Sequence, residues 1–151
     1  MALTDAASIT GPPPALGSSA RRATFVLPTD AKAVGEARRR VQECLSSWGV
    51  DQDGCDTAVL VVSELFTNSV IHTASRLITC NLSAAPDQLL VQVADDGSCQ
   101  SAPMPQTAGV HDEEGRGLML VKTVSRRWGV SPVEDGDGQA VWAALPAQLR
   151  A

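Results

Sequence analysis

The chain has 151 residues, of which 44% are hydrophobic, and a formal net charge of −5 at pH 7. This length suits one globular domain, and the acidic charge argues against nucleic acid as a partner, since phosphate binding depends on Lys and Arg. The four cysteines form no C-x-x-C pair, and no apolar run approaches the roughly 20 residues of a membrane helix, so we expect free thiols in a reducing cytoplasm, without a zinc site or a membrane span.

The first 20 residues are small, polar and rich in Pro, Gly and Ser, without apolar periodicity. This composition predicts a disordered tail over 1–20, followed by an ordered domain over 21–148. The domain should begin with a strand, because Ala23, Phe25 and Leu27 lie at alternate positions, as in a strand with one buried face.

The next segment is predicted to be a helix, capped by Thr29 or Asp30 and closed by Gly49. It carries the basic run 38–40. We interpret this run as a solvated outer face; the alternative is a surface that grips an acidic partner.

A second helix should extend from Gly54 to His72. Two strands are predicted after it, at 77–82 and 89–94, joined by a turn at 84–87.

The stretch 97–114 has neither a helix nor a strand period and is long for a connection inside a domain, so it is a functional lid or disordered. A third helix over 118–125 and two closing strands over 128–131 and 140–145 complete the prediction. Strands joined by short turns indicate a mostly antiparallel sheet with about three helices on one face, which is a two-layer α+β sandwich.

Glu64, Asn68 and His72 recur at every fourth residue and therefore share one line of the second helix. The amide oxygen of Asn68 suits Mg²⁺, which prefers hard oxygen ligands and often takes few protein groups besides nucleotide phosphates. Glu64, one turn earlier, could act as general base toward a hydroxyl or water that attacks the terminal phosphate. Each residue taken alone is more often an ordinary solvated or partly buried side chain.

Two glycine-containing segments follow. Asp95-Asp96-Gly97 ends a predicted strand, where a carboxylate can accept a hydrogen bond from the adenine amine and a glycine lets the backbone approach a flat ring. Gly115-Arg116-Gly117-Leu118 opens the third helix, whose unpaired N–H groups and positive dipole end suit a phosphate, with Arg116 as a charged donor. Taken alone, an ordinary acidic turn and loop-ending glycines explain these residues equally simply.

In this order, the three segments resemble the motifs of the GHKL ATPases, the histidine-kinase-like superfamily with the Bergerat fold. Glu64-Leu65-x-x-Asn68-Ser69-x-x-His72 is similar to the N box, Asp95-x-Gly97 to the first glycine box, and Gly115-x-Gly117-Leu118 to the second. The form of the N box, the short length and the Arg-Trp-Gly strand at 127–129 are most similar to the bacterial anti-sigma regulatory serine kinases. Cys99 departs from the family pattern Asp-x-Gly-x-Gly at its last position.

The resemblance implies that ATP and Mg²⁺ bind between the helices and beneath the lid. Glu64 would be the catalytic base, Asn68 the Mg²⁺ ligand and Asp95 the adenine reader. The further nucleotide contacts implied are His72, Gly97, Gly115, Arg116, Gly117 and Leu118.

The resemblance also implies a homodimeric, cytoplasmic switch kinase without nucleic acid or membrane partners. Such a protein holds a sigma factor and phosphorylates a serine of an anti-anti-sigma antagonist. Two alternatives stay open. Cys99 favours a non-catalytic, nucleotide-gated binding module, whereas the short, polar stretch 1–20 counts against a histidine kinase catalytic domain, because it offers no phosphoacceptor hairpin.

Overall fold

The computed structural model describes residues 8–72, 76–95, 119–132 and 138–149. In chain order its elements are β1 (Ser8–Thr10), β2 (Arg21–Pro28), α1 (Ala33–Ser47), α2 (Gln52–His72), β3 (Leu77–Ala85), β4 (Gln88–Asp95), a helical stretch at 119–124, β5 (Arg127–Pro132) and β6 (Gln139–Pro146).

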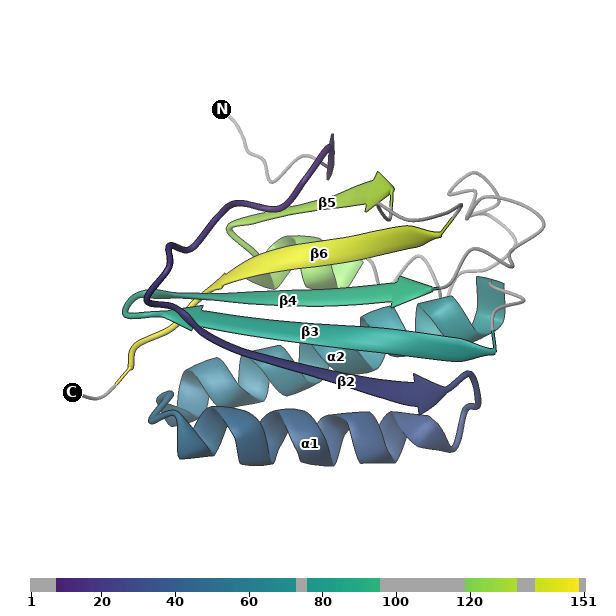
Figure 1. The fold of residues 1–151 in the computed structure, drawn as a ribbon, viewed down its shortest axis with the longest axis horizontal. Coiled ribbons are helices and arrows are strands. Elements are labelled where there is room, and N and C mark those ends of the chain that lie inside the picture. The colour runs from purple at the N-terminus through teal and green to yellow at the C-terminus, as the bar shows by residue number, and fades with distance from the viewer. Residues whose placement is uncertain (1–7, 73–75, 96–118, 133–137, 150–151) are drawn as a thin grey trace.

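The strands form one sheet in the order β1-β5-β6-β4-β3-β2. All neighbours are antiparallel except β1, which pairs in parallel with β5. Both α1 and α2 lie on the same face of the sheet (Figure 1). This confirms the predicted α+β fold, with the parallel strand β1 as an addition.

The core lies between the sheet and the helices. Alternate residues of β2 to β6 face it, whereas α1 and α2 contribute residues three or four positions apart. The largest fully buried residues on this side are Leu45, Val41, Val61, Val62, Leu65, Phe66, Ile78, Leu82, Leu89, Val91 and Leu145. Its aliphatic character follows from the composition.

Helix α2 is apolar enough to meet a simple test for a membrane span. Its stretch Gln52–Ile71 has a mean hydropathy of 1.2, and 39% of it is buried. Since Val61, Val62, Leu65 and Phe66 pack into the core, the fold accounts for the apolar content of this helix.

The predicted end of α1 is confirmed, but its predicted start is not. Helix α1 begins at Ala33, so Asp30 closes the preceding turn instead of capping the helix: its carboxylate accepts the Lys32 N–H at 2.9 Å. At the other end Gly49, with φ 82°, confirms the predicted termination. There the N–H groups of Gly49 and Val50 bond back to the last turn of α1, as in a Schellman motif.

The predicted hairpin is confirmed: β3 and β4 pair throughout and are connected by Pro86 and Asp87. The expected lid at 97–114 lies outside the described residues.

Residues 8–20, which the sequence assigns to a disordered tail, have defined contacts with the sheet. Strand β1 pairs with β5, the Gly11 N–H bonds to the Val130 carbonyl at 3.1 Å, and the Trp142 indole N–H donates to the Gly11 carbonyl at 3.0 Å. These partners lie far away in sequence, so local composition could not reveal them. Residues 1–7 lie outside the described part of the chain.

Candidate functional site

The N-box residues lie on the less buried side of α2. Glu64 and Asn68 are both partly exposed, whereas their neighbours Leu65 and Phe66 are fully buried. One helical turn separates the two polar residues, which corresponds to a rise of about 6 Å along the axis. His72 is the last residue of α2, and its side chain lies outside the described part.

Asp95 is the last residue of β4 and lies opposite Ile78 of β3. Its carboxylate Oδ1 accepts the N–H of Gln139, the first residue of β6, at 3.2 Å. This contact holds the half-buried carboxylate across two neighbouring strands. Sequence reasoning missed Gln139, because nothing local to it indicates a partner 44 positions away.

The topology brings α2 and Asp95 to one end of the molecule. The end of β4 lies beside the start of β3, because these strands are antiparallel, and a short connection joins α2 to β3. Figure 1 shows the C-terminal ends of α2 and β4 at the same end of the sheet. The N-box helix and the first residue of the Asp-x-Gly motif are therefore parts of one region.

The structure does not describe the second glycine segment, so its position relative to this region is not given. Gly97, Gly115, Arg116, Gly117 and Leu118 lie outside the described residues. The helical stretch at 119–124 begins directly after them, with Met119 and Leu120 exposed and Val121 fully buried.

The oxygen-bearing side chains of Asn68 and Asp95 are of the types that bind Mg²⁺ and an adenine amine. No three His, Cys, Asp or Glu side chains gather as a metal site within the described residues. A magnesium ion shared between one protein amide and nucleotide phosphates needs no such cluster. Asn68 is half-buried, so its side chain is not sealed within the core, and Asp95 is half-buried as well.

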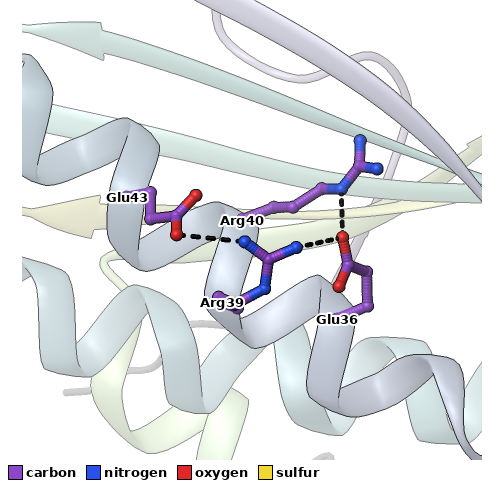
Figure 2. Close-up of polar contacts among 4 residues, drawn as sticks. All are labelled: Glu36, Arg39, Arg40 and Glu43. Carbon is purple, nitrogen blue, oxygen red and sulfur yellow. Dashed lines mark hydrogen bonds and ion pairs between the residues drawn. The ribbon is translucent and has the colours of Figure 1, made fainter.

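The basic run of α1 is largely engaged within its own helix. Figure 2 shows Arg39 between Glu36 and Glu43, with Arg40 also donating to Glu36. Hydrogen bonds from Arg39 and then Arg40 lower the pKa of Glu36 to about 2. Arg40 also lies over the Phe25 ring, 5.6 Å from its centroid. These contacts favour the solvated outer face over a surface for an acidic partner.

The three described cysteines are free thiols, as expected. Burial raises the pKa of Cys80 to about 12 and also raises the pKa of Cys44 and of Cys55. Since the thiolate is the reactive form, the buried Cys55 and Cys80 serve as small apolar groups of the core, whereas Cys44 is only half-buried.

Comparison with known proteins supports the fold at two levels. The sequence model of the histidine kinase-like ATPase domain matches residues 27–145, most of the chain. A solved structure with a similar fold is that of the RsbU and RsbW domains of Rv1364c from Mycobacterium tuberculosis, with a TM-score of 0.57 and 14% sequence identity over 87% of this chain. The chain spans only 35% of that protein. No curated protein sequence matches significantly. Because the domain model covers well over half of its residues, the chain belongs to the histidine kinase-like ATPase domain family.

Proposed function

We propose that this chain is an ATP-dependent serine/threonine protein kinase that acts as an anti-sigma regulatory factor. One observation carries the proposal: Glu64 and Asn68 lie one turn apart on the partly exposed side of α2, whose C-terminal end lies at the same end of the sheet as Asp95, the last residue of β4. In the proposed site these residues act on one nucleotide, Glu64 as the general base, Asn68 as the metal ligand and Asp95 as the carboxylate that binds adenine. Membership of the ATPase family supports nucleotide binding.

The proposed roles follow from the chemistry of each side chain. ATP supplies the phosphoryl group, and Mg²⁺ neutralises the phosphate charge when both are bound. Asn68 holds the metal through its amide oxygen, and Asp95 accepts the adenine amine. Glu64 takes the proton from the attacking serine hydroxyl, which requires it to lie within hydrogen-bond reach of that oxygen.

The proposed partners are a sigma factor, which the protein sequesters, and an anti-anti-sigma protein, which it phosphorylates. The form of the N box supports this choice over other kinases, and a fold match that includes an RsbW domain is in line with it. We further propose that the protein acts as a homodimer in the cytoplasm.

Replacement of Glu64 tests the catalytic role. Glu64→Ala should slow phosphoryl transfer from ATP to serine by about 10²- to 10⁴-fold, the usual contribution of a general base, while ATP affinity stays unchanged. Transfer is measured with radiolabelled ATP and a panel of purified anti-anti-sigma proteins, and affinity by calorimetry. Glu43→Ala, on the exposed face of α1, is the matched control and should transfer normally. Normal transfer by Glu64→Ala would remove Glu64 from this role.

Cys99 favours a second candidate, a nucleotide-gated binding module without kinase activity. Cys99 stands where the family pattern has a second glycine after Asp95 and Gly97. This replacement affects the hinging of the predicted lid over the nucleotide. The wild-type protein would then bind ATP and change its affinity for partners without transferring phosphate. Transfer to any partner of the panel would exclude this candidate.

A further inference from the structure

Trp142 is fully buried, yet it lies on the sheet face opposite α1 and α2. Its cross-strand partner is Gln92, whereas the next pair, Val91 and Ala143, faces the core beneath the helices. Leu90, Trp142 and Ala144 accordingly form a separate apolar cluster, the outer-face cluster. Their exposed fractions are only 8%, 0% and 1%, so another part of the chain must cover them.

The cover is the segment 11–20, the N-terminal strap. Strand β1 lies at one edge of the sheet and β2 at the other, so the strap has to cross five strand spacings, about 24 Å. Ten residues can span at most about 33–36 Å, which leaves little slack. Figure 1 shows this segment passing the end of the sheet where β3 joins β4, on its way from β1 to β2.

The strap contacts the outer-face cluster at a few defined points. Leu16 packs against the cluster, and the Gly11 carbonyl accepts the indole N–H of Trp142 at 3.0 Å. A further neighbour of Trp142 comes from β5 and not from the strap: the Arg127 guanidinium lies 5.9 Å from the Trp142 ring centroid. The strap thus contributes one apolar side chain and one backbone acceptor, both specific to this cluster.

The attachment is nevertheless slight. No residue of the strap is itself buried, and β1 has only three residues. The strap ends in a tight turn, where the Gly17 carbonyl accepts the Ala20 N–H at 3.3 Å and the Arg22 guanidinium at 2.9 Å. A segment with so few buried contacts opens at a lower free energy than the sheet beneath it. Its opening leaves β5 as an unpaired edge strand beside exposed apolar surface.

We propose that residues 8–20 exchange between two copies of this chain, so that the strap of each copy covers the outer-face cluster of the other. Each copy carries both halves of the contact: the donor is β1 with Gly11 and Leu16, and the acceptor is β5 with Trp142. Such self-complementary halves give a closed two-fold dimer when the turn at 17–20 extends. The inference deepens the homodimer of the proposed function and does not depend on phosphoryl transfer.

Crosslinking between full-length chains tests the exchange. One chain carries Leu16→Cys and the other Leu90→Cys, both in a background where the native Cys44 and Cys99 are replaced by Ser. The two chains are mixed, incubated and treated with a short bismaleimide. Exchange predicts a crosslinked species of twice the 15.8 kDa chain mass. A Ser47→Cys acceptor, on the exposed side of α1, is the matched control and should give none.

A single chain that carries both Leu16→Cys and Leu90→Cys tests the contact itself. If this double variant crosslinks within one chain while the mixture gives no dimer, the strap binds only its own chain and the proposal is overturned. If neither crosslinks, the contact between strap and cluster is absent, which overturns it as well.

A second measurement does not depend on crosslinking. Leu16→Asp should reduce the light-scattering mass from twice 15.8 kDa to 15.8 kDa, whereas Leu16→Met should keep the dimer. A dimer that Leu16→Asp leaves intact contradicts the exchange. Unchanged ATP binding in both variants would separate this result from a failure of the nucleotide site.

Discussion

Asp95 and Asn68 have different proposed roles in nucleotide binding, so single substitutions distinguish the two roles. Asp95→Asn should weaken ATP binding by about 10- to 100-fold, because a hydrogen bond to a charged group is worth about 1.5–3 kcal/mol. Asn68→Ala should remove the dependence of that binding on Mg²⁺. Calorimetry with and without Mg²⁺ measures both effects.

Asp87→Asn is the control for this pair. Asp87 is exposed in the β3–β4 turn, at the opposite end of the hairpin from Asp95, and its replacement should leave ATP affinity unchanged. Because Asp95 also accepts the Gln139 N–H, thermal unfolding of each variant must be checked. Wild-type affinity in a folded Asp95→Asn protein would contradict its role as the adenine reader.

Gly54 lies where the start of α2 meets the end of the chain. A Cβ at this position would lie 2.8 Å from Asp51 Oδ1, 2.9 Å from Val50 Cγ1 and 3.0 Å from Ala147 Cβ. Gly54→Ala should therefore lower the free energy of unfolding by about 1–3 kcal/mol, as overpacking does.

Gly35 is the matched control for this substitution. It also lies in the first turn of a helix, but a Cβ there would meet nothing within 4 Å. Gly35→Ala should raise the free energy of unfolding by about 0.5–1 kcal/mol. Urea denaturation measures the free energy of unfolding of both variants. Equal changes in the two would show that the close contacts at Gly54 do not destabilise the Gly54→Ala protein.

At the scale of elements, the α1 charge network predicts a pH effect. The pKa of Glu36 falls from its ordinary 4.5 to about 2, chiefly through Arg39 and then Arg40. A lowered pKa means that the folded state holds the proton less tightly than the unfolded state does. The stabilisation is thus present above pH 4.5 and is lost as the pH falls toward 2.

Glu36→Gln removes this effect. The stability difference between wild type and Glu36→Gln should shrink across that acidic range in urea denaturation, and added salt should reduce it at neutral pH, since the pair is solvent-exposed. Glu43→Gln retains the shared acceptor of both arginines and should change the pH dependence less. A constant difference between wild type and Glu36→Gln at every pH would contradict the network.

Most helices and strands could be predicted because their signals are local. Alternation fixed the strand that became β2, and Pro86 with Asp87 indicated the hairpin between β3 and β4. The start of α1 was misplaced, since the side chain of Asp30 bonds the turn before the helix. For the candidate site, spacing placed Glu64 and Asn68 on one side of α2, but the contact between Asp95 and Gln139 depends on strand order.

At the scale of the whole molecule, the position of the N-terminal strap could not be predicted from the sequence. Residues 8–20 have the composition of a disordered segment, and their order comes from a distant strand edge and from Trp142. Trp142 in turn is buried only because the strap covers it. Neither feature can be predicted from local sequence, because each segment supplies the surface that the other lacks.

The pairing of β1 with β5 also sets an order of events during folding. The partners of residues 8–10 lie at 128–130, and the Gly11 carbonyl accepts from Trp142, 131 positions away. Contacts so distant in sequence form slowly and late. A refolding chain should therefore form the hairpin of β3 and β4 before residues 8–20 cover Trp142, and the change in Trp142 fluorescence on burial would time that last step.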